Sequence, residues 1–577
     1  MIRIARSWFR SALVLGALGV GAACGDRGAE EGSAVKGAAG KGSEQAERGG
    51  TAIVAELADV DKPHPIVAES VQDGDMVDVM YMPLLRGAWR DGRPAYLTSH
   101  DSPMALAWHW EYAGPDSSAI RYRMRSGLKW SDGEPITARD VVWTYDMIRD
   151  PRVASPRQDY VSQLDSVVAE NDSTVTFHFK RRYPEMLHHS GIPIAPRHAY
   201  EGSDPSQLRT HRRLLSPENG NMVVSGPFMV GSWRRGQELT LVPNPHFPVR
   251  PHLDRIVRRV VPETTTRVVE LQTGKVDFAR PIPADQVPQI RAQTPNVRFE
   301  QEEKRYYDYI AYNPRAFDAF ADPEIRRALG LAIDVPGLIR ALQMEEIAVP
   351  AAGPYSPIFS QLYDPQRNPP LPYDPEQARR ILEAKGWRDT NGDGIREKDG
   401  KPFRFTLLTN SGNQRRSDIQ QVVQQQWKQI GVDARLQQME FNTFMDRLTN
   451  KKFEAAVGNW GVALSPDLTE LWGRDAKFNF VSYENPRVTQ LFQQALEQPT
   501  EAAAVPYWKA AAEQISNDQP YTFLFYFDQL DGVNNRLRGI EVDTYGAYQN
   551  TWEWWIPKDQ QRSGQRADTA RGADTAR

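Results

Sequence analysis

Residues 122–145 have the sequence YRMRSGLKWSDGEPITARDVVWTY, and this stretch decides the fold. From 120 to 125, apolar and charged side chains alternate, as they do in a half-buried β-strand. The turn that follows contains Gly133, which can adopt a positive φ angle. Thr137 is a favourable helix N-cap, and Asp140 three residues later completes a capping box. The stretch therefore predicts a strand, a turn and a capped helix in succession.

The rest of the chain mixes strand and helix patterns without a regular β–α–β alternation. Alternation predicts strands at 173–180, 238–242, 256–261, 403–409 and 434–439, and helical spacing predicts helices at 264–274, 324–333, 375–385 and 419–430. Two aromatic, apolar segments, Tyr306–Asn313 and Phe523–Phe527, are predicted to be buried strands that cross between two lobes. These patterns indicate a mixed α/β (α+β) fold.

Several short motifs along the chain occur in the order found in one known family. They are Gly226-Pro227-Phe228, Asn244-Pro245, 272–277, 325–329, 374–378, Gly386-Trp387 and Ile430-Gly431-Val432. Together with 122–145, this ordered set resembles the extracytoplasmic solute-binding protein family 5, which includes oligopeptide-, dipeptide- and nickel-binding proteins. The resemblance covers about residues 50–557. Residues 122–145 identify the family but not the ligand site.

The resemblance implies a type II periplasmic-binding-protein-like fold, with two lobes joined by hinge strands and an additional middle domain. Lobe 1 is expected to be discontinuous, with residues 51–81, 190–305 and 528–557. The middle domain is expected at 82–189 and lobe 2 at 306–527. Hinge closure around a ligand is the motion expected of this architecture.

The N-terminus has the pattern of an export signal. Three arginines precede a short apolar stretch that is too short to span a bilayer, so residues 1–23 are predicted to be a signal peptide. The sequence before Cys24 resembles a lipobox, although Gly21 departs from the usual leucine. This indicates lipidation of Cys24, with a flexible linker at 24–50. The alternative is an ordinary signal peptide that leaves Cys24 as a free thiol.

Composition narrows the possible partners. The net charge is −4, and 40% of the residues are hydrophobic, which is typical of a globular chain. No long basic run or zinc-ligand pattern occurs, so nucleic acid is not expected as a partner. At the C-terminus, 558–577 contains two copies of ADTAR without apolar periodicity and is predicted to be a disordered tail.

The resemblance places the ligand beside the segment 457–467, which enters the cleft in the family. Trp460 is the favoured contact, with the backbone of Gly461 offering strand-like hydrogen bonds; the alternative is a core tryptophan. Peptide-binding relatives have an aspartate at the position occupied here by Ala463. Asp467 either replaces that aspartate or belongs to a structural Asp-Pro turn.

Further cleft-lining positions by the same resemblance are Tyr526 and, in lobe 1, the stretch that contains Val67 and Glu69. Because Ala463 carries no charge, the sequence predicts weak binding of free dipeptides that depend on an ammonium anchor.

One acidic segment, Asp389–Glu397, resembles a calcium-binding loop in part. Oxygen-bearing side chains at alternate positions and a glycine at the sixth match a calcium loop, but the twelfth position is Gly400 instead of glutamate. The sequence favours an acidic turn, and no metal is expected. His188-His189 has no third ligand at metal spacing.

No enzyme motif, nucleotide site or cofactor signature was found, so the chain is expected not to be an enzyme and to need no cofactor. The function expected is the substrate-binding component of an ABC importer, which captures a peptide or other small solute. The protein is expected to be a monomer outside the cytoplasm, in the periplasm or cell envelope, anchored by lipid and docking on membrane permeases. The alternatives are a sensor or chaperone-like lipoprotein on the same scaffold and, less favoured, a hydrolase.

Overall fold

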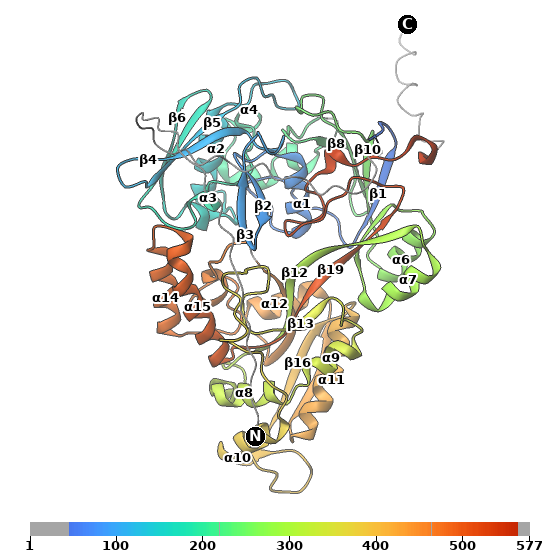
Figure 1. The fold of residues 1–577 in the computed structure, drawn as a ribbon. Helices are drawn as coiled ribbons and strands as arrows, with labels where there is room; N and C mark the ends of the chain where they lie inside the picture. The colour runs from blue at the N-terminus through green and yellow to red at the C-terminus, as the bar shows by residue number, and fades with distance from the viewer. Residues whose placement is uncertain (1–44, 219, 463, 563–577) are drawn as a thin grey trace, which may run out of the picture. The chain divides into compact units, whose positions relative to one another are not determined.

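The computed structural model describes residues 45–218, 220–462 and 464–562 (Figure 1). The described residues from 46 onward belong to one compact unit. The predicted signal peptide, Cys24, most of the predicted linker and Ala463 lie outside the described residues. Within those residues, no helix combines the length and the apolar character needed to cross a membrane.

A long mixed sheet forms the backbone of the fold. Its strand order is β17-β16-β18-β12-β19-β11-β1-β10-β9-β8, with β13 pairing with β19. The strands are β1 (Thr51–Glu56), β8 (Phe228–Arg234), β9 (Glu238–Pro243), β10 (Arg255–Val260), β11 (Phe278–Ile282), β12 (Val297–Tyr312), β13 (Ala348–Pro350), β16 (Arg404–Asn410), β17 (Asp433–Met439), β18 (Ala455–Gly461) and β19 (Tyr521–Asn534).

Strands β12 and β19 run antiparallel side by side through the middle of this sheet (Figure 1). The N-terminal half of β12 pairs with the C-terminal half of β19, which also pairs with β11. The opposite halves pair with β18 and β13. The two predicted crossing strands are thus confirmed as strands, and each is part of a longer element. The pairing shifts register between Glu302 and Tyr306.

A second, four-stranded sheet contains the strand that begins the stretch 122–145. Its order is β4-β5-β7-β6, with β4 (Ala107–Ala113), β5 (Ala119–Met124), β6 (Leu164–Asn171) and β7 (Thr174–Phe179). The strand–turn–helix prediction is confirmed: Gly133 has φ of 93°, and helix α2 (Ala138–Arg149) begins at the N-cap Thr137. Asp140 Oδ2 accepts the Thr137 backbone N–H at 2.8 Å, as a capping box requires.

Two small ribbons and the helices complete the fold. The ribbons are β2 (Arg86–Arg90) with β3 (Arg93–Leu97), and β14 (Glu397–Lys398) with β15 (Lys401–Pro402). The other helices are α1 (Val71–Met80), α3 (Met186–His189), α4 (Arg197–Tyr200), α5 (Arg212–Leu215), α6 (Thr264–Gln272), α7 (Val287–Gln293), α8 (Pro323–Leu331), α9 (Val335–Ala341), α10 (Pro375–Ala384), α11 (Gln414–Gln429), α12 (Phe441–Thr449), α13 (Thr469–Trp472), α14 (Pro486–Leu496) and α15 (Glu501–Asp518). The strands and helices predicted from periodicity all occur, with boundaries shifted by a few residues.

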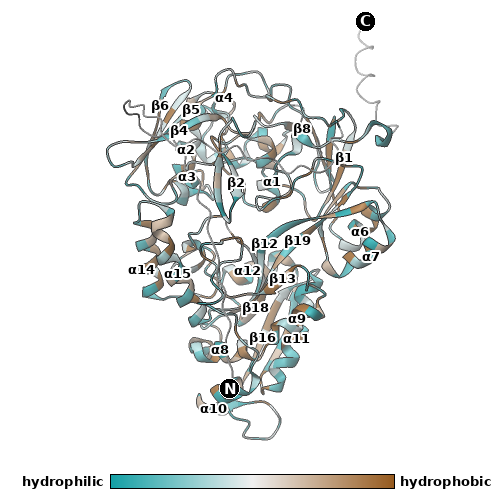
Figure 2. Cartoon of the chain, in the orientation of Figure 1, coloured by the Kyte–Doolittle hydropathy of each residue, from teal (hydrophilic) through white to brown (hydrophobic). Residues whose placement is uncertain are grey.

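Apolar residues on one face of each helix pack inward. Helices α14 and α15 lie beside each other, and each carries both hydrophobic and hydrophilic residues (Figure 2). On α14 the buried residues Val488, Leu491, Phe492 and Ala495 recur at helical spacing. Within the described ranges, five tryptophans are fully buried, namely Trp130, Trp427, Trp472, Trp508 and Trp554. Each buries a large apolar area, so burial alone accounts for much of the stabilisation of a chain with one cysteine.

The folded body extends beyond both ends that the sequence predicts for it. Lys558–Gln560 forms a turn of 3₁₀ helix, and the Lys558 N–H donates to Glu47 Oε2 at 2.6 Å. Arg562 Nη2 lies 3.2 Å from Asp277 Oδ1. The predicted linker 24–50 and tail 558–577 therefore each include residues that belong to the folded body.

One hydrophobic core also joins residues of the predicted lobe 1 to residues of the predicted middle domain, such as Tyr81 and Tyr122.

Candidate functional site

A cavity of about 130 Å³ lies between residues 94–187 and residues 464–501. Its walls combine aromatic rings, prolines and two carboxylates: Pro94, Tyr96, Tyr112, Tyr183, Pro184, Glu185 and Leu187 on one side, and Leu464, Pro466, Pro499, Thr500 and Glu501 on the other. The second wall contains part of the segment 457–467, beside which the family resemblance predicts the ligand.

The two walls are joined by a buried contact. Ser465 Oγ donates a hydrogen bond of 2.7 Å to Glu185 Oε2. Burial raises the pKa of Glu185 to about 8, and the hydrogen bond from Ser465 offsets only part of that rise. In the described part of the chain, no Lys or Arg forms an ion pair with Glu185. A buried carboxylate in this position lacks a counter-charge whenever it is ionised.

The second carboxylate in the cavity belongs to Glu501, the first residue of α15. Burial also raises the pKa of Glu501, while Arg93 acts in the opposite direction. Two carboxylates among tyrosine rings make the cavity unfavourable for an anion. A cationic group fits it, because both ionised carboxylates and the faces of aromatic rings attract positive charge.

Additional contacts hold the two walls together around the cavity. Trp89 Nε1 donates to the Ile358 carbonyl oxygen at 3.3 Å, and its ring meets Phe359 edge-on with centroids 5.2 Å apart. Arg182 Nε donates to the Pro499 carbonyl oxygen at 3.1 Å. The segments 82–189 and 306–527 are therefore in direct contact in this structure.

Trp460 and Gly461 lie at the end of β18. One edge of this strand pairs with β12, where Trp460 is opposite Tyr307. On the other edge, β18 pairs with β16 only through Ala455 and Ala456. Trp460 is half-buried, and its ring packs near Tyr309, Phe478 and Phe480, with centroid separations of 5.4 to 6.2 Å. Its environment thus combines core packing with a strand edge that β16 does not cover.

Asp467 and Tyr526 both have intramolecular partners. Asp467 Oδ1 accepts the Thr469 backbone N–H at 3.0 Å and the Thr469 hydroxyl at 2.5 Å, which is the turn arrangement weighed from the sequence. Tyr526 is fully buried, and its hydroxyl accepts from the Gly353 N–H at 3.0 Å and donates to the Gly353 carbonyl at 2.6 Å. In this structure neither residue lines the cavity.

Val67 and Glu69 lie elsewhere, in the chain that precedes α1. Val67 is buried in the hydrophobic core, whereas Glu69 is exposed and pairs with Arg209 Nη2 at 2.8 Å. The structure therefore does not bring these two residues to the cavity with Leu464 and Pro466.

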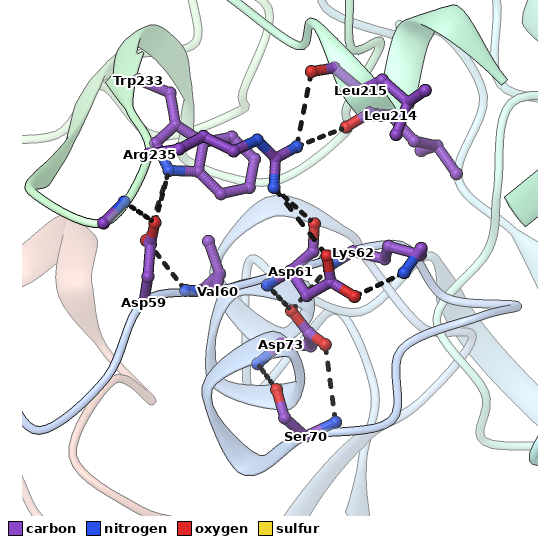
Figure 3. Close-up of polar contacts among 11 residues, drawn as sticks. Asp59, Val60, Asp61, Lys62, Ser70, Asp73, Leu214, Leu215, Trp233 and Arg235 are labelled. Atoms are coloured by element: carbon purple, nitrogen blue, oxygen red, sulfur yellow. Dashed lines mark hydrogen bonds and ion pairs between the residues drawn. The ribbon is translucent and has the colours of Figure 1, made fainter. Parts of the chain in front are cut away.

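A network of polar contacts fixes the chain before α1 and at its start (Figure 3). Asp73 Oδ1 accepts the backbone N–H groups of Asp61 and Lys62 at 2.7 and 2.9 Å. Arg235 donates to the Asp61 carbonyl oxygen at 3.1 Å, and its guanidinium lies 3.8 Å from the centre of the Trp233 ring. The network holds the start of α1 against the neighbouring β8 segment.

The two adjacent histidines have tyrosine partners. His188 Nε2 lies 3.0 Å from the Tyr160 hydroxyl, and His189 Nδ1 lies 2.7 Å from the Tyr183 hydroxyl. Burial lowers the pKa of His188 to about 4 and that of His189 to about 3, so both rings are neutral at pH 7. Among the described residues, the one group of carboxylates, histidines or thiols close enough to share a metal ion is Asp389, Asp393 and Glu397.

Sequence reasoning missed the cavity residues on the first wall, above all Glu185. One signal was available, because Glu185 lies between Tyr183-Pro184 and Met186-Leu187 and an acid in an apolar stretch is unusual. The sequence alone could not indicate that this acid faces Ser465.

Comparison with known proteins identifies the family. The model of the bacterial extracellular solute-binding proteins, family 5 Middle, matches residues 102–480. Among curated relatives, the oligopeptide-binding protein AppA of Bacillus subtilis is 29% identical over 448 residues, which are 76% of this chain and 81% of the relative.

Solved structures agree in fold. AppA from Bacillus subtilis in complex with a nonapeptide has a TM-score of 0.77 at 26% identity, covering 89% of this chain and 100% of that one. NikZ from Campylobacter jejuni in complex with Ni(L-His) has a TM-score of 0.76 at 22% identity, covering 88% and 99%. The type II periplasmic-binding-protein fold expected from the sequence is confirmed. The chain therefore belongs to the bacterial extracellular solute-binding proteins of family 5.

Proposed function

We propose that this protein is the substrate-binding component of an ABC importer and that it encloses its solute between the walls of the Glu185 cavity. The observation that carries the proposal is the buried Glu185–Ser465 contact, which joins the two walls of the cavity from distant parts of the chain. AppA, the relative with a nonapeptide bound, supports a peptide or similar solute. The membership in a family of solute-binding proteins supports binding over catalysis.

Glu185 also suggests how an ammonium group is held without an acid at position 463. Ser465 lies two residues beyond Ala463 in sequence, and it binds Glu185 from the facing wall. An incoming ammonium would lower the pKa of Glu185, favour its ionised form and supply the missing counter-charge. The proposal thus replaces the expectation of weak ammonium-dependent binding with an ammonium site on the opposite wall.

We expect the two walls of the cavity to close by a hinge motion at β12 and β19, the strands shared by the two proposed lobes. The proposed lobe 1 (51–81, 190–305 and 528–557) carries the middle domain (82–189) and moves against lobe 2 (306–527) about β12 and β19. The ligand favours the closed state to the extent that it binds that state more tightly. The closed form would then dock, as a monomer anchored through a lipidated Cys24, on permease subunits in the membrane.

Mass spectrometry of solute released from natively purified protein, followed by calorimetric titration, tests this function. The free and the Nα-acetylated forms of the same peptide are titrated into the wild type, Glu185→Gln and the control Glu111→Gln. Glu111 is partly exposed, pairs with Arg121 and does not line the cavity. We expect acetylation and Glu185→Gln each to weaken binding at least tenfold, and Glu111→Gln to leave it unchanged. Equal binding of both peptide forms would contradict the ammonium site. Time-dependent cleavage of the peptide would contradict a purely binding function.

A further inference from the structure

The loop 389–397 has a fixed frame. It links α10 to β14, and its ends are joined by two backbone hydrogen bonds between Arg388 and Glu397, of 2.7 and 3.0 Å. The Arg396 guanidinium points into the body, where Nε donates to the Ile430 carbonyl oxygen at 2.8 Å and Nη1 to that of Trp387 at 2.9 Å. The loop is therefore anchored to the folded chain at both ends.

Three carboxylates converge inside this loop. One oxygen from each of Asp389, Asp393 and Glu397 lies within 4.8 Å of the others. Among the described residues, no Lys or Arg forms an ion pair with any of the three. Both Asp389 oxygens also accept backbone N–H groups, from Gly392 at 2.7 Å and Gly394 at 3.0 Å, and both glycines have positive φ. Three like charges are thus held close together without a counter-charge from the described chain.

A second observation concerns the glutamate alone. Glu397 is 9% exposed, and its Oε2 accepts the Thr390 N–H at 2.9 Å and the Thr390 hydroxyl at 3.0 Å. Its Oε1 is buried, and no donor in the described part of the chain reaches it. Buried carboxylate oxygens normally have a partner, because an unpaired one loses its hydration without compensation. A bound cation would supply the missing partner.

We propose that this loop binds Ca²⁺ through the carboxylates of Asp389, Asp393 and Glu397. The ligands are all hard oxygens, and oxygens within 4.8 Å of one another can surround an ion at the 2.3–2.6 Å that Ca²⁺ requires. Mg²⁺ is disfavoured because it demands near-ideal octahedral geometry at shorter distances. The sequence favours a plain acidic turn because Gly400 stands at the twelfth position; the unsatisfied Glu397 oxygen changes that interpretation.

Ca²⁺ is expected to bind weakly, because Gly400 stands where a calcium loop has a bidentate glutamate. Waters must complete the coordination, so the dissociation constant should fall near the range of about 10⁻⁴–10⁻³ M found for extracellular modules. The bound ion would stabilise the junction between α10 and the β14–β15 ribbon. This role does not depend on the solute cavity or on the proposed transport function.

The test is a Ca²⁺ titration of the full mature chain after removal of metal with a chelator. Thermal unfolding and Tb³⁺ luminescence are measured for the wild type, Asp393→Asn, Glu397→Gln and Asp399→Asn. Asp399→Asn is the control, because it makes the same charge change as Asp393→Asn. Asp399 lies in the neighbouring ribbon, outside the cluster.

We expect millimolar Ca²⁺ to raise the wild-type melting temperature by a few degrees, with a smaller effect of Mg²⁺. Asp393→Asn and Glu397→Gln should weaken binding at least tenfold, and Asp399→Asn should behave as the wild type. Asp393 is exposed, so its variant should fold even if Glu397→Gln does not. The absence of both a melting shift and a Tb³⁺ signal in the wild type would overturn the proposal. Equal weakening by Asp399→Asn would overturn it as well, because it would show only a diffuse charge effect.

Discussion

Ser465 Oγ and Glu185 Oε2 form a 2.7 Å hydrogen bond between residues 280 positions apart in the chain. Both side chains are buried, and Glu185 and Pro466 face the same cavity. Separating the two walls would expose both groups to water and break this contact. The contact therefore links the charge state of Glu185 to the proposed closure of the two walls.

The first prediction concerns pH. The pKa of Glu185 is about 8 in this structure and 4.5 for an unperturbed glutamate, so the folded chain binds the proton more tightly than the unfolded chain. The favourable effect of the protonated carboxyl is complete below pH 4.5 and is lost as the pH rises through 8. Ligand-free wild type should thus lose at most a few kcal/mol of unfolding free energy between pH 5 and 8 relative to Glu185→Gln. Denaturant unfolding at several pH values measures this difference, and parallel pH profiles of the two proteins would rule the linkage out.

The second prediction concerns Arg280, which is buried among three acids. It lies 3.1 Å from Asp75, 2.8 Å from Glu302 and 3.3 Å from Asp531. Arg280→Met leaves these acids without their cation and should destabilise the protein by about 3–5 kcal/mol. Urea unfolding at pH 7 checks this value.

The control for Arg280 is Arg291→Met, which removes an exposed arginine paired with Glu346 at 3.5 Å. Exposed pairs contribute about 0–1 kcal/mol, so this variant should unfold close to the wild type. Similar losses in both variants would contradict the role assigned to the buried cluster.

The third prediction separates stability from binding at Tyr526. Its hydroxyl makes two hydrogen bonds with the Gly353 backbone, so Tyr526→Phe should cost about 1–3 kcal/mol of unfolding free energy. Solute affinity should stay within about twofold, because Tyr526 does not line the cavity and its hydroxyl proton is already donated to Gly353. Calorimetry and denaturant unfolding on the same sample measure both quantities. A loss of affinity without a loss of stability would instead support the ligand contact that the sequence indicates.

The fourth prediction compares two glycines of β18. A Cβ atom at Gly458 would lie 2.6 Å from the Tyr309 hydroxyl oxygen and 2.7 Å from its ring, whereas one at Gly461 would have its nearest neighbour, Tyr306, at 3.2 Å. Because Tyr309 is buried, Gly458→Ala should cost about 1–3 kcal/mol, and Gly461→Ala should cost less. Thermal unfolding ranks the two variants, and the reverse order would show that β18 is packed differently.

Much of the fold could be predicted from local patterns. Thr137 and Asp140 form the capping box that their spacing indicates, and the predicted strand 306–313 lies in β12 up to Tyr312. The site was harder to predict, since Val67 and Tyr526 are buried away from the cavity and Glu185 was not considered. Local hydrogen bonding and side-chain alternation act over a few residues. They therefore determine where strands and helices form, but not which of these strands and helices contact one another.

Sequence patterns alone indicated the family by resemblance, the mixed α/β class and the strand, turn and helix around 122–145. Strands and helices of this kind depend on periodicity, turns and caps, which are formed by residues close together in the sequence. The tertiary structure was needed to show that Glu185 lies against Ser465 and that Glu397 Oε1 is buried with no donor from the described residues. Burial and pairing of charges depend on groups far apart in the chain, whose positions are fixed only when the whole body packs.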